Sequence, residues 1–126
     1  MSESNAELAR RGYEAAARGD FEAIAALLAV DVRWHGGNPS DPAACHDRGE
    51  ALAFMRQAAA RDGIGELVDV VEVGQKVVVI ICPPGRDLAE DGALAANLTT
   101  FADGKVVEMV HFPDPEAALA AARSAP

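Results

Sequence analysis

Two side chains in the last third of the sequence, Asn97 and His111, could perform chemistry together. Histidine suits general acid or base catalysis because free imidazole titrates close to neutral pH. An asparagine amide can donate hydrogen bonds to an oxygen that gains negative charge during a reaction. We therefore interpret His111 as a candidate acid or base and Asn97 as a polarising donor. The structural alternatives are a histidine bonded to a backbone group or to Asn97, and a core amide that serves a neighbouring strand.

The pairing of two strand-like segments, 94–101 and 105–112, decides which side chains share a face with His111. Ala102-Asp103-Gly104 fits a three-residue turn with a left-handed glycine. This turn pairs Phe101 with Lys105, Thr99 with Val107, Asn97 with Met109 and Ala95 with His111. Paired residues point to the same side of a sheet. One face is then predicted to carry Asn97, Thr99, Val107, Met109 and His111, and the other Leu98, Val106, Val110 and Phe112.

Three further reactive residues are weaker candidates for a functional role: His35, Cys45 and His46. Together with Asp47 they have no recognised metal-ligand spacing, so we expect no metal site and no cofactor. Cys45 is a weak candidate for a nucleophile, and the other cysteine, Cys82, ends an apolar strand. His35 alternates with Trp34 and should face solvent or a dimer partner. The roles of His35, Cys45 and His46 stay open at this level.

The helices and strands predicted from the sequence determine where these residues lie. Ser4 and Glu7 have the spacing of a capping box, and Asp20 can cap the helix that follows. We expect helices over residues 5–18, 21–29, 48–61 and 116–122, with Pro115 in the first turn of the last one. We expect strands over residues 30–35, 66–73, 76–82, 94–101 and 105–112. The pattern predicts one α+β domain over residues 1–126, with an ordered core of about 6–122. It has three helices in the N-terminal half, a short C-terminal helix and a curved, mostly antiparallel sheet.

Composition excludes several classes of partner. The 126 residues include 20 Asp and Glu against 11 Lys and Arg, which gives a net charge of −9. An acidic chain without a basic cluster is a poor partner for nucleic acid or for an anionic membrane. The N-terminus has no apolar run typical of a secretory signal, and no segment approaches the length of a membrane span. With only two cysteines, we expect a cytoplasmic protein.

Three ordered motifs carry a resemblance to a known family. They are Tyr13 followed by Gly19-Asp20-Phe21, then Asp31-Val32-Arg33-Trp34-His35, and finally Asp103-Gly104-Lys105-Val106-Val107-Glu108. In this order they resemble the nuclear transport factor 2-like superfamily, and within it the SnoaL-like proteins. The resemblance implies a cone-shaped sheet that curls around a pocket closed by helices. Members include ketosteroid isomerases, polyketide cyclases, dehydratases, epoxide hydrolases and non-catalytic binders, so the fold alone does not define the function.

Position by position, the resemblance to ketosteroid isomerases is incomplete. Gly36 occupies the place of their catalytic aspartate, so that general base is missing. Asn97 resembles the acid of their oxyanion hole, and Tyr13 lies one position from their tyrosine on the first helix. The SnoaL-like cyclases have a carboxylate near the last strand, where this chain has His111 with Asp114 just beyond. Steroid isomerisation is therefore disfavoured.

These observations lead to one hypothesis and one alternative. The hypothesis is a cofactor-free enzyme that isomerises, cyclises, dehydrates or hydrolyses a mostly apolar small molecule. His111 and Asn97 would be catalytic, and the cavity walls would be Tyr13, Trp34, Phe54, Thr99 and Met109. The alternative is a non-catalytic ligand-binding or dimeric interaction domain. Both faces of the predicted sheet are apolar and the helices should cover only one, so we expect a homodimer through the other face.

Overall fold

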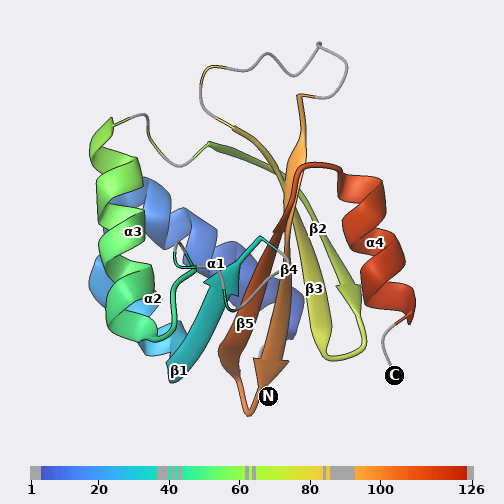
Figure 1. The fold of residues 1–126 in the computed structure, drawn as a ribbon, viewed down its shortest axis with the longest axis horizontal. Coiled ribbons are helices and arrows are strands. Elements are labelled where there is room, and N and C mark those ends of the chain that lie inside the picture. Colours follow the sequence, from blue (N-terminus) through green and yellow to red (C-terminus); the bar gives the residue numbers. More distant parts are fainter. Residues whose placement is uncertain are drawn as a thin grey trace.

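The computed structural model describes residues 4–36, 40, 42, 44–61, 63, 65–83, 85 and 93–124. Its elements follow the order helix, helix, strand, helix, four strands, helix (Figure 1). They are α1 (Asn5–Arg18), α2 (Phe21–Leu27), β1 (Leu28–His35), α3 (Arg48–Arg61), β2 (Glu66–Val73), β3 (Lys76–Cys82), β4 (Ala95–Ala102), β5 (Lys105–Phe112) and α4 (Pro115–Ser124). The α+β class is confirmed. No helix among these residues is long and apolar enough to cross a membrane.

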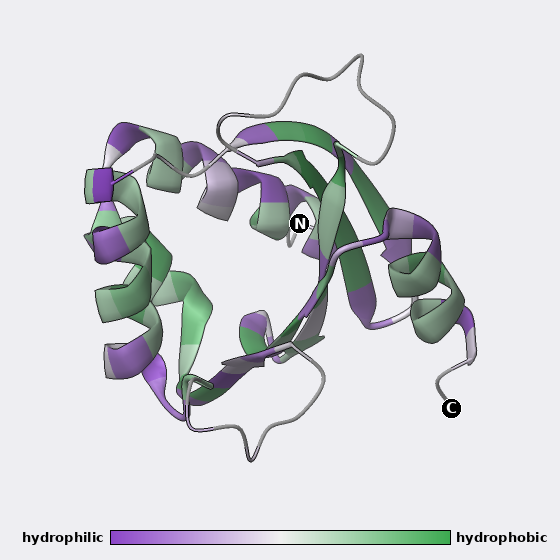
Figure 2. Ribbon diagram, turned by 45° about the horizontal axis from the view of Figure 1, so that its top comes forward, coloured by the Kyte–Doolittle hydropathy of each residue, from purple (hydrophilic) through white to green (hydrophobic). Residues whose placement is uncertain are grey.

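The five strands form one curved sheet in the order β1-β5-β4-β3-β2. β1 runs parallel to β5, and the remaining neighbours are antiparallel. In Figure 2 the sheet separates α4 from the group formed by α1, α2 and α3, and its middle strands are mostly hydrophobic. We call the side facing α1–α3 the inner face and the side facing α4 the outer face.

Local signals set the ends of the first two helices. The Ser4 hydroxyl accepts a hydrogen bond from the Glu7 backbone, and the Glu7 carboxylate accepts one from the Ser4 backbone, as a capping box requires. α1 ends at Gly19, which is left-handed, and the Asp20 carboxylate caps α2. α2 is shorter than the sequence predicts, because Leu28 is already extended and pairs with β5.

The turn between β4 and β5 differs from the three-residue prediction. Ala102 pairs with Lys105, so only Asp103 and Gly104 form the turn. Both have positive φ, 53° and 77°, which is the geometry of a two-residue type I′ hairpin. The predicted pairs were therefore wrong. A bulge follows, in which Thr100 pairs with Glu108 and Phe101 with Val106, leaving Val107 as the extra residue on β5.

The bulge moves some residues to the other face of the sheet and leaves others on the predicted face. Thr99 now pairs with Met109 and Asn97 with His111, so Asn97 and His111 are directly opposite rather than diagonal. Val106 moves from the predicted outer face to the inner one, where it joins the core with Phe101. Leu98 pairs with Val110 on the outer face, as expected.

A helix of the same chain, α4, covers part of the outer face. α4 packs on β3, β4 and β5, and its Ala118 and Ala122 form a buried cluster with Val78, Ala96 and Leu98. The expectation that helices would cover only one face was therefore wrong. Small residues in both α4 and the sheet allow this helix to approach closely.

His35 differs from its prediction in exposure. It pairs in register with Val110, which places it on the outer side of β1, away from Trp34. Its ring is nevertheless buried, with 9 % of the residue exposed, and Nε2 lies 2.8 Å from the Glu108 carboxylate. Of the two expected positions, exposure to solvent was wrong because Glu108, on the neighbouring strand, supplies a polar partner, and contact with a dimer partner stays a prediction.

Candidate active site

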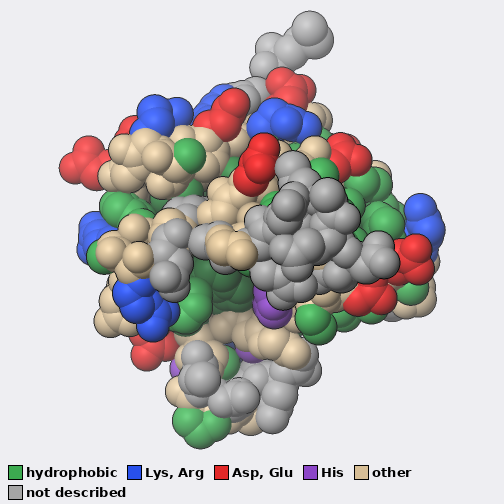
Figure 3. All heavy atoms as spheres, turned by 90° about the horizontal axis from the view of Figure 1, so that it is seen from above, with side chains coloured by type: hydrophobic (Ala, Val, Ile, Leu, Met, Phe, Trp, Pro, Cys, Tyr) green, Lys and Arg blue, Asp and Glu red, His purple; other side chains and the backbone are tan. Residues whose placement is uncertain are grey.

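A cavity of about 560 Å³ lies between α1–α3 and the inner face of the sheet. This is the size range of small-molecule sites. Figure 3 looks onto the end of the molecule at which β1, β5 and α3 finish, and this surface is hollowed in the middle, with a histidine side chain at the edge of the hollow. All seven residues predicted to act on or bind a ligand line the cavity: Tyr13, Trp34, Phe54, Asn97, Thr99, Met109 and His111.

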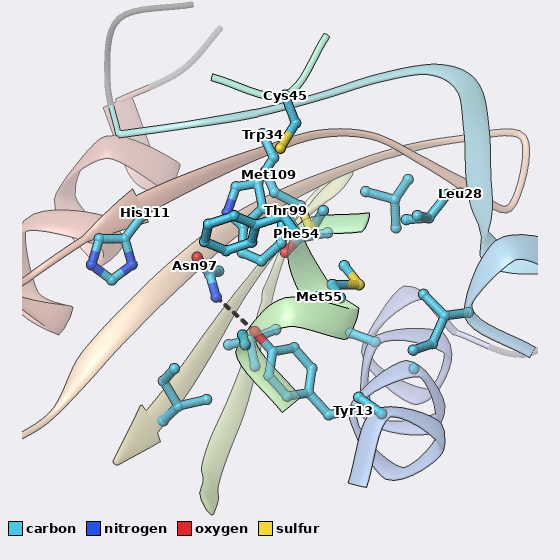
Figure 4. Close-up of a pocket in the computed structure, with 18 of the residues that line it drawn as sticks. Tyr13, Leu28, Trp34, Cys45, Phe54, Met55, Asn97, Thr99, Met109 and His111 are labelled. Atoms are coloured by element: carbon cyan, nitrogen blue, oxygen red, sulfur yellow. Dashed lines mark hydrogen bonds between the residues drawn. The ribbon is translucent and has the colours of Figure 1, made fainter. Parts of the chain in front are cut away.

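The central polar group of the cavity is a pair formed by α1 and β4. The Asn97 amide nitrogen donates a hydrogen bond of 2.6 Å to the Tyr13 hydroxyl oxygen (Figure 4). Because this oxygen accepts, the hydroxyl proton of Tyr13 is not used by Asn97. The Asn97 Oδ1 atom is buried and has no hydrogen-bond partner among the described residues. With the amide in this orientation, the Tyr13 hydroxyl proton and Asn97 Oδ1 are available to a ligand.

The orientation of the amide decides which groups stay available to a ligand. If the amide turned by 180°, the Tyr13 hydroxyl would donate to Oδ1, and the two Asn97 N–H groups would become the free donors. A buried polar atom without a partner destabilises a fold by about 1–3 kcal/mol. Asn97 is only 3 % exposed and lines the cavity, so a partner for this polar atom has to come from the cavity.

Burial keeps the Tyr13 side chain in its protonated form. Loss of solvent raises the pKa of the Tyr13 phenol, and the hydrogen bond from Asn97 opposes this rise in part. The hydroxyl group is consequently a hydrogen-bond donor, not an anion, at neutral pH.

His111 occupies a different environment although it faces Asn97 directly across the two strands. Side chains in such cross-strand pairs have Cβ atoms about 4.5–5.5 Å apart. His111 is exposed at the end of β5 and borders the cavity. Its ring has no hydrogen-bond partner within the described part of the chain. Asn97 bonds to Tyr13 instead, so the alternative in which His111 and Asn97 satisfy each other does not apply.

An aromatic wall closes one side of the cavity. The Trp34 and Phe54 rings meet edge to face, with centroids 4.9 Å apart. The backbone of Trp34 forms an antiparallel bridge with Cys45, which brings the thiol to the cavity. Burial, and to a lesser degree the carboxylates of Glu50 and Asp47, raise the pKa of the Cys45 thiol. A thiol that stays protonated is a poor nucleophile, in agreement with its low ranking from the sequence.

The cavity has one apolar end and one polar end. Leu28 pairs with Val106 at the start of the parallel strands β1 and β5, and both line the cavity. Asn97 and His111 pair near the end of β5. Figure 4 shows Leu28 and His111 on opposite sides of the space. A ligand with distinct apolar and polar parts would therefore have a preferred orientation.

Sequence reasoning missed Arg61, the last residue of α3. It lines the cavity together with Met55 and Ala58. The spacing of three residues between these positions places them on one helix face, and this signal was available in the sequence.

The remaining reactive residues do not join the site. His46 is exposed, and its backbone and ring both contact the carboxylate of Glu50. His35 borders the cavity at the end of β1, but its ring is bonded to Glu108. Within the described ranges, no three of the histidines, cysteines and acids are close enough to hold a metal ion.

Comparisons with known proteins agree with this architecture. The profile of the SnoaL-like domain matches residues 9–109. Bal32a, from a soil-derived mobile gene cassette, is 25 % identical, with a TM-score of 0.69 over 90 % of this chain and 92 % of its own. An NTF2-like protein of unknown function from Cytophaga hutchinsonii is 15 % identical, with a TM-score of 0.71 over 94 % and 97 %.

A third structure, from Pseudomonas putida, is provisionally assigned as a polyketide cyclase. It is 21 % identical, with a TM-score of 0.62 over 88 % of this chain and 92 % of its own. A comparison with curated proteins found no significant match. The curled sheet and the helices that enclose its inner face are the fold of the NTF2-like protein from Cytophaga hutchinsonii. The match of residues 9–109 leads to one conclusion: the chain belongs to the SnoaL-like family.

Proposed function

We propose that this protein is a cofactor-free enzyme that moves a proton on a mostly apolar carbonyl compound, as an isomerase or a cyclase does. The observation that carries the proposal is the hydrogen bond between Asn97 and Tyr13, which leaves the hydroxyl proton and Oδ1 available in an apolar cavity. Preorganised donors in such a site stabilise an oxygen that becomes negative during the reaction.

The proposed step needs only residues that line the cavity. His111 removes a proton from the carbon next to a carbonyl group. The electron pair of the broken C–H bond forms a carbon–carbon double bond, and the carbonyl π electrons move onto the oxygen. The resulting enolate accepts a hydrogen bond from the Tyr13 hydroxyl. Return of the proton from His111 to another carbon isomerises the substrate. Alternatively, the enolate carbon attacks a second carbonyl group to close a ring, and the proton held by His111 passes to the new alkoxide oxygen. The pairing of His111 with Asn97 supports this assignment.

Hydrogen exchange on a simple ketone tests the proposal without knowledge of the natural substrate. The bicyclic ketone 2-tetralone, dissolved in deuterium oxide, exchanges its α-hydrogens through the enolate, and NMR measures the rate. We expect the wild-type protein to accelerate this exchange. His111→Ala should reduce the acceleration by about 10²-fold because the base is lost. Tyr13→Phe should reduce it by about 10²-fold because the enolate loses its donor.

His46→Ala is the matched control, because His46 is exposed and bonded to Glu50 outside the cavity. It should exchange at the wild-type rate. A loss equal to that of His111→Ala would indicate surface buffering by histidine and would contradict the proposed role of His111.

A second candidate function is supported by one observation. None of the described residues that line the cavity is an aspartate or glutamate, although such a base is usual in related isomerases, and Gly36 stands at its expected position. A domain that binds its ligand without turnover needs no base. If 2-tetralone binds to the wild-type protein but exchanges no faster than in buffer, this alternative replaces the enzyme.

We also propose a homodimer in the cytoplasm. α4 covers the centre of the outer face, while Val71, Ile80 and Val110 beside it are only partly buried. Both cysteines are buried and neither is in a disulfide bond, which fits a reducing compartment. Light scattering at micromolar concentration tests the dimer, and a monodisperse monomer would contradict it.

A further inference from the structure

The ionisable side chains at the cavity are unusual for so acidic a protein. The sequence has 20 Asp and Glu, yet no carboxylate is among the described residues that line the cavity. Three lining residues can carry positive charge: Arg61, His35 and His111. His35 is bonded to Glu108 on the outer side, which leaves Arg61 and His111 for the cavity.

Arg61 and His111 line the same cavity, each from near the end of its element. Arg61 is the last residue of α3 and His111 is near the end of β5, and both of these ends lie at the top in Figure 1. Within the described residues, neither side chain has an ion-pair or hydrogen-bond partner. Some other exposed cations have partners, whereas Arg10, Arg33 and Arg123 have none among the described residues. Arg18 lies 3.5 Å from Asp20, and Arg56 lies over the Phe21 ring.

An arginine at the end of a helix is favoured by the helix dipole, so its presence alone does not indicate a ligand. Its position at the cavity, without a carboxylate to balance it, is the additional observation. A fixed positive charge at the rim of an otherwise apolar cavity attracts an anion and repels a cation. Because both residues are exposed, an anion bound there would keep part of its hydration, which limits the desolvation cost.

We propose that the ligand is an amphiphilic carboxylic acid, whose apolar body fills the Leu28–Val106 end and whose carboxylate lies at the rim beside Arg61. This inference rests on the proposed function, because it assumes that the cavity binds a small molecule. Arg61 is then a residue that selects the charge of the substrate, and Tyr13 and Asn97 contact a carbonyl group further along the same molecule.

Three fluorescent ligands of one shape and different charge test the inference: 1-pyrenebutyrate, its neutral amide and the corresponding cationic amine. Pyrene fluorescence reports the dissociation constant of each. We expect wild-type protein at low salt to bind the carboxylate about tenfold more tightly than the amide, as a charge-assisted hydrogen bond permits. The amine should bind most weakly. The preference should shrink when the ionic strength rises from about 0.01 M to about 1 M, where the Debye length falls to about 3 Å.

Substitutions on helix α3 distinguish the effect of the charge at the cavity rim from the effect of the net charge of the protein. Arg61→Gln should remove most of the preference for the carboxylate and leave the affinity for the amide unchanged. Arg61→Lys should keep most of it. Arg56→Gln is the matched control, because Arg56 lies on the same helix over Phe21 and does not line the cavity. It should keep the full preference.

Binding of the neutral pyrene amide distinguishes failure of this inference from failure of the proposed function. If the amide and the carboxylate bind equally well to the wild-type protein, the inference is overturned and the ligand-binding cavity stands. Equal losses in Arg56→Gln and Arg61→Gln would also overturn it, because net charge would then explain the preference. If none of the three ligands binds, both the inference and the proposed binding function fail.

Discussion

The two faces of strand β4 show how one strand serves both stability and binding. Ala96 and Leu98 point outward and pack beneath α4 in a closed apolar cluster. Asn97 and Thr99, between and beside them, point inward to the cavity. All four are buried, so burial does not distinguish the faces. They differ in what each side chain meets: packed protein on the outer face, and space with an unpaired polar atom on the inner face.

The largest difference should appear when one large side chain is truncated on each face. Leu98 and Met109 are equally buried, with 6 % exposed. Leu98→Ala should lower the free energy of unfolding by about 3 kcal/mol, because the packed outer face cannot fill the new void. Met109→Ala should cost about half as much, because its side chain already borders the cavity and loses fewer contacts. Urea denaturation measures both. An equal or larger cost for Met109→Ala would contradict the comparison.

The hydrogen-bonded pair of Asn97 and Tyr13 should be more important for function than for stability. Asn97→Leu alone should cost about 1–2 kcal/mol, because the Tyr13 hydroxyl loses its partner. Tyr13→Phe combined with Asn97→Leu should be close to wild type in stability, since replacing both partners leaves no unpaired group. A double-mutant cycle by urea denaturation measures this coupling, and additive costs would show that the pair does not interact.

High pH should lower the free energy of unfolding, because the buried Tyr13 phenol has a raised pKa. Burial raises the pKa of this phenol above its usual value near 10, so the folded state keeps a proton that the unfolded state releases. The unfolded state then binds fewer protons, and stability falls as pH rises above about 10, by at most about 1.4 kcal/mol per pH unit. Below this range the stability contribution is fully present.

Tyr13 is the only tyrosine in the sequence, so tyrosinate absorbance follows its titration directly. We expect a midpoint clearly above 10 in the folded protein, and a weaker loss of stability at high pH for Tyr13→Phe. A midpoint at or below 10 would show that the phenol is solvated and that the cavity is open there.

The smallest effect is expected for the polar contact on the outer side of β1 and β5. Glu108→Gln should cost about 1 kcal/mol or less, because the Glu108 side chain is 37 % exposed and solvent screens its contact with His35. Thermal unfolding at neutral pH measures the change. Glu50→Gln, at the exposed contact with His46, is the matched control and should have a smaller effect. A large loss for Glu108→Gln would mean that the contact with His35 contributes to the core.

The sequence by itself determined the features that depend on neighbours along the chain. The capping box at Ser4 and the cap of α2 at Asp20 are each specified within a few residues, and each is present. The alternation along β4 also placed Asn97 and Thr99 on one face without knowledge of the partner strand, because side chains alternate strictly along a strand.

Tertiary structure decided the features that depend on distant residues. Ala102-Asp103-Gly104 is compatible with turns of two or three residues, and the choice depends on whether Asp103 adopts positive φ. Tyr13 and Asn97 are 84 positions apart, so their bond requires α1 to pack on the inner face. α4 covers the outer face because Ala118 and Ala122 meet Val78 and Leu98 there. Local preferences act over a few residues, whereas strand register and helix docking depend on the total apolar surface buried by the whole chain.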